Sequence, residues 1–205
     1  MAPGSVRGRA SVNLAILVEE RSMKAFLEGL LPRILPDTTS FQIVAHEGKS
    51  DLDLSIPRKL RAWRTPDTRF VIVRDQDGED CRAVKDRIAT LCADAGRGDT
   101  LVRIACRELE AWFFGDLVAL SAALSELPIS AIGKKKLYRD RDPDGICKPS
   151  GELARIVPSY GKVKVARAMG CRIDLARCTS ESFRQFHTGI LKFASRCQSE
   201  SVPSS

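Results

Sequence analysis

The chain has 205 residues, of which 43% are hydrophobic and 29% are charged, and its formal net charge is +7. These proportions are those of an ordinary folded, soluble protein, so they exclude a wholly disordered or fibrous chain. The longest apolar run near the amino end, Val12 to Val18, is too short to cross a bilayer and lacks a signal-peptide cleavage site, so we expect no membrane association.

Strands and helices alternate through the first 130 residues. Strands are predicted at 12–18, 41–46, 70–73 and 101–106, because short β-branched runs occur there. Between them, apolar side chains recur at helical spacing: one helix begins with Ser22 as its cap and is kinked or ended by Pro32, and another ends at Gly96. Residues 47–50 are predicted to form a loop. This alternation predicts a mostly parallel α/β sheet with helices on both faces.

The pattern changes after residue 130, where turn-rich and basic segments lead into helices predicted near 151–157, 162–170 and 180–196. We therefore divide the chain into an α/β core at 10–130, a basic, mainly helical extension at 131–197 packed on the core, and a disordered tail at 198–205.

Positive charge is concentrated in the extension. Residues 1–130 contain 18 Lys and Arg against 19 Asp and Glu, whereas residues 131–205 contain 15 against 7. This concentration favours a polyanion such as nucleic acid as partner, since each phosphate contact releases counterions. A basic surface that serves only solubility is the alternative. The residues expected to grip a nucleic-acid backbone are Lys134, Lys135, Lys136, Arg139, Arg141, Lys148, Lys162, Lys164 and Arg167.

Acidic residues follow three of the four predicted strands. Glu19 and Glu20 follow the first strand, Asp75 and Asp77 the third, and Glu108 with Glu110 the fourth. The carboxyl ends of parallel strands share one edge of the sheet, which is where ligands bind in such folds. Carboxylates gathered there repel one another unless a cation neutralises them, and Mg²⁺ prefers oxygen ligands. Each acidic residue could instead be an ordinary polar residue at a strand end.

The order of these residues resembles the Toprim domain, which topoisomerases, bacterial primases and overcoming-lysogenization-defect nucleases share. The similarity is greater to a Toprim-like bacterial family of unknown function. Its typical stretches stand here as Val18-Glu19-Glu20, Asp75-Gln-Asp77-Gly-Glu-Asp80-Cys81 and Arg107-Glu108-Leu-Glu110-Ala-Trp112, with further similarity at 46–51 and 141–144.

The resemblance implies a Toprim-like, Rossmann-like fold and a metal-dependent nuclease that binds one or two Mg²⁺ or Mn²⁺ ions. It makes Asp75 and Asp77 metal ligands, Glu19 a ligand or general base, and Glu108 or Glu110 a further ligand, with Glu108 preferred because it is nearer the strand end. Glu20 replaces a glycine of the usual pattern, so whether Glu19 alone or Glu20 as well reaches the metal stays open. Asp80 is a further candidate ligand.

Lys49 is expected at the same edge, where it could stabilise charge on a phosphate or simply be exposed. Relatives are often encoded beside an AAA or ABC-type ATPase in anti-phage defence systems, and the 205 residues contain no G-x-x-x-x-G-K-[ST], so an ATPase partner is expected. Homo-oligomer formation stays open. Two other functions remain: a regulatory or binding subunit of an ATPase complex, and a phosphatase of small phosphate esters.

The cysteine, histidine, tryptophan and tyrosine residues indicate the location of the protein, structural roles and one excluded function. The seven cysteines form no C-x-x-C pair, which indicates a reducing, cytoplasmic location. His46 and His187 are expected to be structural, as are Trp63 and Trp112. Only Tyr138 and Tyr160 could serve as a topoisomerase nucleophile, and the chain is too short for a strand-passage gate, so a topoisomerase is not expected.

Overall fold

The computed structural model describes residues 12–125, 142–158 and 160–199. Four strands form one sheet in which every neighbouring pair is parallel, in the order β2-β1-β3-β4. The two central strands are therefore β1 and β3, and their carboxyl ends lie next to each other. The strands are β1 (Val12–Val18), β2 (Thr39–Ala45), β3 (Thr68–Asp75) and β4 (Leu101–Ala105).

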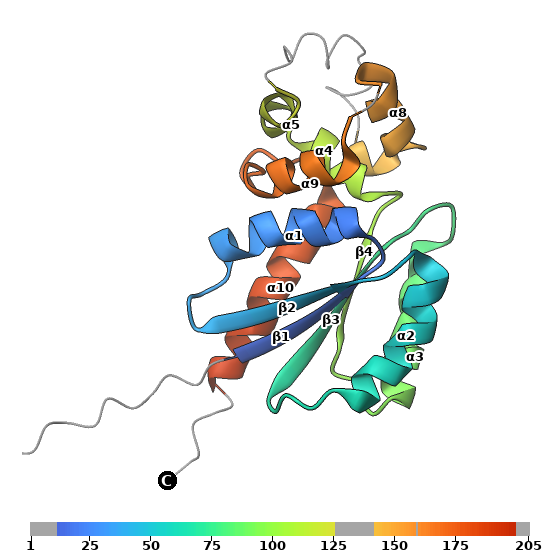
Figure 1. The fold of residues 1–205 in the computed structure, drawn as a ribbon, viewed down its shortest axis with the longest axis vertical. Helices are drawn as coiled ribbons and strands as arrows, with labels where there is room; N and C mark the ends of the chain where they lie inside the picture. Colours follow the sequence, from blue (N-terminus) through green and yellow to red (C-terminus); the bar gives the residue numbers. More distant parts are fainter. Residues whose placement is uncertain (1–11, 126–141, 159, 200–205) are drawn as a thin grey trace, which may run out of the picture.

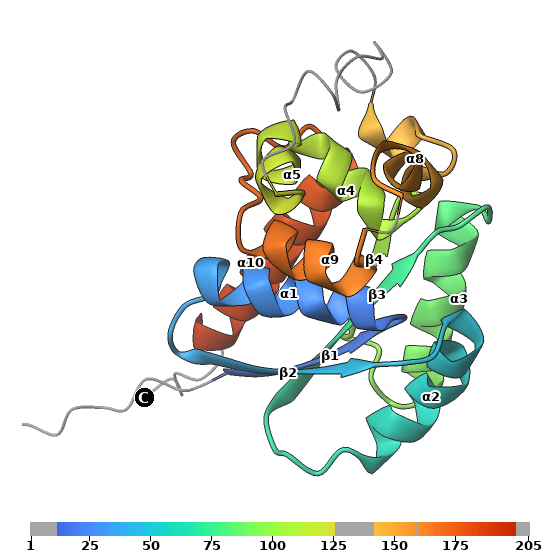
Figure 2. The same cartoon turned by 45° about the horizontal axis from the view of Figure 1, so that its top comes forward.

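Helices cover both faces of the sheet, as Figure 1 shows. One face is packed against α1 and α10, and the other against α2 and α3. The remaining described helices gather beyond the carboxyl ends of the strands (Figure 2). The helices are α1 (Arg21–Ile34), α2 (Lys49–Ala62), α3 (Cys81–Asp94), α4 (Leu109–Gly115), α5 (Leu117–Ala123), the short 3-10 helix η1 (Pro143–Gly145), α8 (Pro149–Ile156), α9 (Lys162–Gly170) and α10 (Glu181–Ser199).

The central strands are buried on both faces because their successive side chains point to opposite sides. Ile16 and Val18 of β1 belong to the core beneath α1 and α10, whereas Ala15 and Leu17 belong to the core beneath α2 and α3. The apolar side chains of residues 12–18 thus pack in two separate hydrophobic cores. None of the helices in the described part of the chain is long and apolar enough to cross a membrane.

Helix α9 lies directly against α1, and two glycines make this close approach possible. A Cβ on Gly170 would stand 2.0 Å from the Phe26 carbonyl oxygen, and one on Gly29 would stand 2.8 Å from the Arg167 carbonyl oxygen. Larger side chains would force the two helices apart. This contact fixes the amino end of α9, with Lys162, beside the end of β1.

Three local predictions differ from the structure. Ser22 lies inside α1, whose N-cap is Glu20. Pro32 does not end α1, which continues to Ile34 because the Leu35 amide closes a final turn on the Leu31 carbonyl at 2.9 Å. Lys49 begins α2 instead of lying in a loop, since Gly48, with φ +100°, turns the chain and its carbonyl accepts the first helical hydrogen bond.

Candidate metal and phosphodiester site

The ends of β1 and β3 bring two of the predicted carboxylates together. Glu19 directly follows β1 and is 8% exposed, while Asp75 is the last residue of β3. The Asp75 amide donates a hydrogen bond to Glu19 Oε2 at 3.3 Å. Because the register pairs Val18 with Val73, Glu19 is level with Arg74, and Asp75 lies one residue further along.

A third carboxylate reaches this place from α4. Glu110 is 1% exposed, and the Tyr160 hydroxyl donates a hydrogen bond to its Oε1 at 3.3 Å. The Glu108 carboxylate is used differently, because its Oε2 accepts a hydrogen bond from the Ser150 amide at 2.7 Å. The Glu110 charge acts directly on Asp75. We therefore propose Glu110, in place of the preferred Glu108, as the partner of Asp75.

The negative charge of this group is only partly compensated within the described part of the chain, by Arg74 beside Glu19 and by Lys162 near Glu110. Asp75 Oδ1 and Glu110 Oε2 are both buried there without a hydrogen-bond partner. Burial, together with the charges of Glu110 and Glu19, raises the pKa of Asp75 well above its usual value. Burial and the charge of Asp77 raise the pKa of Glu19 to about 7, and burial also raises the pKa of Glu110. Such a group attracts a cation.

Lys162 of α9 brings a positive charge to the edge of this group. Its ammonium lies 2.7 Å from Glu20 Oε2. Burial opposes the ammonium charge, but the hydrogen bond to Glu20 and the nearby Glu110 outweigh it and raise the pKa of Lys162. Glu20 is thus engaged by a lysine, whereas Glu19 faces Asp75. The sequence suggests for Tyr160 only the role of a nucleophile. Its contact with Glu110 depends on where the chain before α9 lies.

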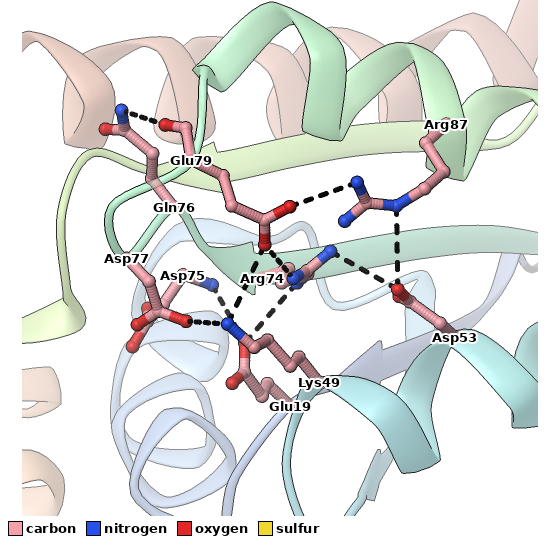
Figure 3. Close-up of polar contacts among 9 residues, drawn as sticks. All are labelled: Glu19, Lys49, Asp53, Arg74, Asp75, Gln76, Asp77, Glu79 and Arg87. Atoms are coloured by element: carbon pink, nitrogen blue, oxygen red, sulfur yellow. Dashed lines mark hydrogen bonds and ion pairs between the residues drawn. The ribbon is translucent and has the colours of Figure 1, made fainter.

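Arg74 is the main site residue that the sequence analysis missed. Its side chain is 1% exposed and contacts three carboxylates: Glu79 at 2.8 Å, Asp53 at 3.4 Å and Glu19 at 3.7 Å. Figure 3 shows this guanidinium between Glu19, Asp53 of α2 and Glu79 of the loop before α3. A signal was present in the sequence, because an arginine directly follows the apolar run of β3 and directly precedes Asp75.

Asp77 lies on the outer side of the group, where Lys49 reaches it. Lys49 Nζ is 3.3 Å from Asp77 Oδ2 and 3.8 Å from Glu79 Oε1 (Figure 3). Asp77 has φ +56°, a conformation in which aspartate is more common than most residues, and its amide donates to the Arg107 carbonyl at 2.8 Å. Asp80 caps α3 by accepting a hydrogen bond from the Ala83 amide at 2.8 Å.

Oxygen donors of this kind fit a hard divalent cation, although they are not arranged as a complete set of ligands. Among residues 12–125, 142–158 and 160–199, no three His, Cys, Asp or Glu side chains already form a group that could hold a metal ion. Mg²⁺ commonly takes only one or two protein carboxylates and completes its coordination with water and substrate phosphates. The unpartnered oxygens of Asp75 and Glu110 are consistent with that mode of binding.

Of the nine basic residues predicted to hold nucleic acid, the structure describes Lys148, Lys162, Lys164 and Arg167. Lys134, Lys135, Lys136, Arg139 and Arg141 lie outside the described residues. Lys148 and Lys164 are exposed, whereas Arg167 forms an ion pair with Glu28 at 2.6 Å. The aromatic and imidazole rings have structural contacts: Trp112 Nε1 donates to Ser182 Oγ, and His46 Nδ1 lies 2.8 Å from the Val18 carbonyl oxygen.

The raised pKa of Glu19 predicts a pH-dependent stability. A carboxyl group whose pKa is higher in the folded state binds its proton more tightly there, so its favourable contribution is complete below about pH 4.5 and is lost as the pH rises through about 7. In EDTA, Glu19→Gln should therefore exceed the wild type in free energy of unfolding by at most about 3 kcal/mol at pH 8. Urea denaturation at pH 8 and pH 4.5 measures this, and an equal difference at both pH values would contradict it.

The fold and the site define the class of this protein. It is an α/β protein with a Toprim-like parallel sheet and an acidic edge. The profile of the family described as "Domain of unknown function (DUF4276)" matches residues 18–191, and the chain belongs to this family. A search of curated proteins finds no significant match.

Two solved structures have the same fold. The C-terminal region of the Burkholderia pseudomallei OLD protein is 17% identical with a TM-score of 0.51, and the match covers 90% of this chain and 98% of that one. The C-terminal region of the Xanthomonas campestris pv. campestris OLD protein is also 17% identical with a TM-score of 0.51, and the match covers 93% and 98%. At this identity the likeness shows the fold, and it confirms the predicted Toprim-like α/β class.

Proposed function

We propose that this protein is a Mg²⁺-dependent nuclease that cleaves phosphodiesters of nucleic acid at the carboxylate edge of its sheet. The observation that carries the proposal is the gathering of the Glu19, Asp75 and Glu110 carboxylates at one edge of the sheet, where Asp75 Oδ1 and Glu110 Oε2 are buried without a hydrogen-bond partner among the described residues. A protein maintains such a group only at a cost in stability, and perturbed carboxylates at the ligand edge of a parallel sheet are typical of a functional site. The similarity of the fold to OLD C-terminal regions supports the nuclease class.

The residues have distinct roles in this proposal. Asp75, Asp77 and Glu110 would hold the cation, with Glu19 as a further ligand or as general base, and the bound cation would stabilise the charge that develops on the phosphate during displacement. Glu19, with a pKa of about 7, can accept a proton at neutral pH. Lys49, paired with Asp77, and Lys162, paired with Glu20, would provide positive charge for the phosphate oxygens.

An ATPase partner and a role in anti-phage defence belong to the same proposal. The similar structures are C-terminal regions of longer proteins, so there this fold is joined to a further part of the chain. The 205 residues contain no phosphate-binding loop sequence, so a nucleotide-driven step would need another protein. The basic extension would grip the nucleic-acid backbone. A reducing cytoplasm is the proposed location, supported by the free thiols of the six described cysteines.

The test is cleavage of labelled single- and double-stranded DNA and RNA by the purified protein in Mg²⁺, Mn²⁺ or EDTA. We expect cleavage in Mg²⁺ or Mn²⁺, none in EDTA, and none by Asp77→Ala at equal thermal stability. Asp86→Ala is the matched control, because Asp86 is an exposed aspartate on α3, away from the carboxylate group. An unchanged rate in Asp77→Ala would exclude the assigned site.

Two further measurements separate the alternative functions. Turnover of a generic phosphomonoester without cleavage of any nucleic acid would favour a phosphatase. Absence of both activities, combined with co-purification of an ATPase, would favour a regulatory subunit.

A further inference from the structure

A cavity of about 570 Å³ lies along β4, and Gln76, between Asp75 and Asp77, lines it, whereas the carboxylate group does not. Its walls come from β4, the beginning of α3, the loop after β4, η1 and the beginning of α10. Val102 and Ile104 provide apolar surface, and polar side chains surround them. The volume is in the range of cavities that bind small organic molecules, and no role assigned so far uses it.

Gln76 connects the cavity with the carboxylate group. In Figure 3 its side chain points away from the Asp77 carboxylate. Gln76 Oε1 accepts a hydrogen bond from the Arg107 amide at 3.0 Å, and Nε2 donates to the Glu79 carbonyl at 2.8 Å. The Asp77 amide in turn donates to the Arg107 carbonyl. Gln76, Asp77 and Arg107 therefore connect the wall of the cavity with the proposed metal site.

Two cationic side chains of the cavity have no partner in the described part of the chain. Neither the Lys85 ammonium nor the Arg107 guanidinium forms an ion pair or a side-chain hydrogen bond with any described residue. Arg107 also has φ +62°, a conformation that is uncommon for a residue with a long side chain and that costs about 1 kcal/mol or more. Arg103 is different, because its guanidinium donates to the Gln185 and Val102 carbonyls.

Three carboxylates also line the cavity, but each is already hydrogen-bonded. Asp144 accepts hydrogen bonds from the Ser180 hydroxyl and from the amide and hydroxyl of Ser182, at 2.7 to 2.9 Å. Asp142 accepts one from the Asp144 amide, and Glu181 one from Gln185 Nε2. The cavity groups without a partner among the described residues are therefore the Lys85 ammonium and the Arg107 guanidinium, and both are suited to bind an anion.

We propose that this cavity binds one nucleotide of the substrate strand next to the scissile phosphodiester, with its phosphate on Lys85 and Arg107. This inference rests on the proposed nuclease function. The apolar surface of Val102 and Ile104 would contact the sugar and base. A strand whose phosphate lies at Asp75 and Asp77 would pass over the Gln76–Arg107 wall into the cavity, so the cavity would set the position of the cut.

The proposal is tested with the full chain and the double variant Lys85→Ala/Arg107→Ala. A labelled single-stranded oligonucleotide is titrated in EDTA over a range of salt concentrations, which requires no catalysis. The slope of log Kd against log salt should decrease by about 0.7, because the variant loses one single-strand phosphate contact and each such contact contributes about 0.7. In Mg²⁺, KM should rise about tenfold with little change in kcat, since the lost contacts hold substrate and transition state equally.

The control is Arg61→Ala/Arg64→Ala, which removes the same charge at the end of α2, near the amino end of β3. Lys85→Glu, on the exposed surface of α3, provides a second variant if Arg107→Ala reduces folding. Unchanged slope and KM in the cavity variants, while the wild type cleaves, would overturn the inference and leave the nuclease intact. Binding of a free nucleoside monophosphate as tight as that of the oligonucleotide would also overturn it. Failure of the wild type to cleave would remove the nuclease proposal and with it the scissile position, and the salt slope in EDTA would then report only whether the cavity binds a strand.

Discussion

Asp75→Asn is expected to abolish metal-dependent cleavage and, at the same time, to make the protein more stable at pH 8 in EDTA. Asparagine keeps the shape of the side chain but removes a buried negative charge that Glu110 and Glu19 repel. A carboxyl group whose pKa is raised by folding costs stability once the pH exceeds its unfolded-state pKa, so its replacement by a neutral amide removes this cost at pH 8. The cleavage rate should fall by roughly 10²–10³-fold or more, because a direct contribution to transition-state charge is lost.

The comparison that decides this prediction uses Asp77→Asn. Asp77→Asn should also remove cleavage, because Asp77 is a proposed metal ligand. Asp77 is more exposed than Asp75 and is paired with Lys49, so its replacement should not raise the melting temperature. Melting curves in EDTA and in Mg²⁺ measure both variants. Mg²⁺ should raise the melting temperature of the wild type and not that of Asp75→Asn, since a ligand that binds only the folded state stabilises it. A lower melting temperature of Asp75→Asn in EDTA would contradict the assigned electrostatics.

Arg74→Met should be the most destabilising single substitution in the site. The guanidinium is buried and compensates Glu19, Asp53 and Glu79 together. Removing one partner of a buried ion pair costs about 3–5 kcal/mol, because the remaining charge stays buried and unpaired. In a chain of this length that corresponds to a decrease in melting temperature of about 6–20 °C. The melting temperature of Arg74→Lys should lie between those of the wild type and Arg74→Met, since one ammonium cannot contact three carboxylates at once.

Arg87→Met is the matched control for this measurement. Arg87 pairs with Asp53 and Glu79 as well, but its side chain is 43% exposed. Ion pairs exposed in this way contribute about 1 kcal/mol or less. Equal losses of melting temperature in the two variants would show that the burial of Arg74 does not have the assigned effect.

The sequence determined most of the fold. All four strands lie where β-branched runs predicted them, and the helices of the basic extension lie at α8, α9 and α10. These elements could be predicted because hydrophobic periodicity reports which face of a strand or helix is buried. The convergence of Glu19 and Asp75 could also be predicted, since parallel strands bring their carboxyl ends to one edge. Element boundaries at Ser22, Pro32 and Lys49 depended on single hydrogen bonds and on the conformation of Gly48.

Tertiary structure decided which of the acidic residues act together. Glu108 and Glu110 are two residues apart, and only the packing of α4, with Ser150 and Tyr160 beside it, separates a carboxylate that holds a loop from one that faces Asp75. The position of Lys162 depends on the close contact of α1 with α9, and the three-carboxylate role of Arg74 depends on α2 and the loop before α3, which bring Asp53 and Glu79 to it. Such contacts join residues far apart in the chain. Periodicity and spacing describe only local preference, so they cannot specify these contacts.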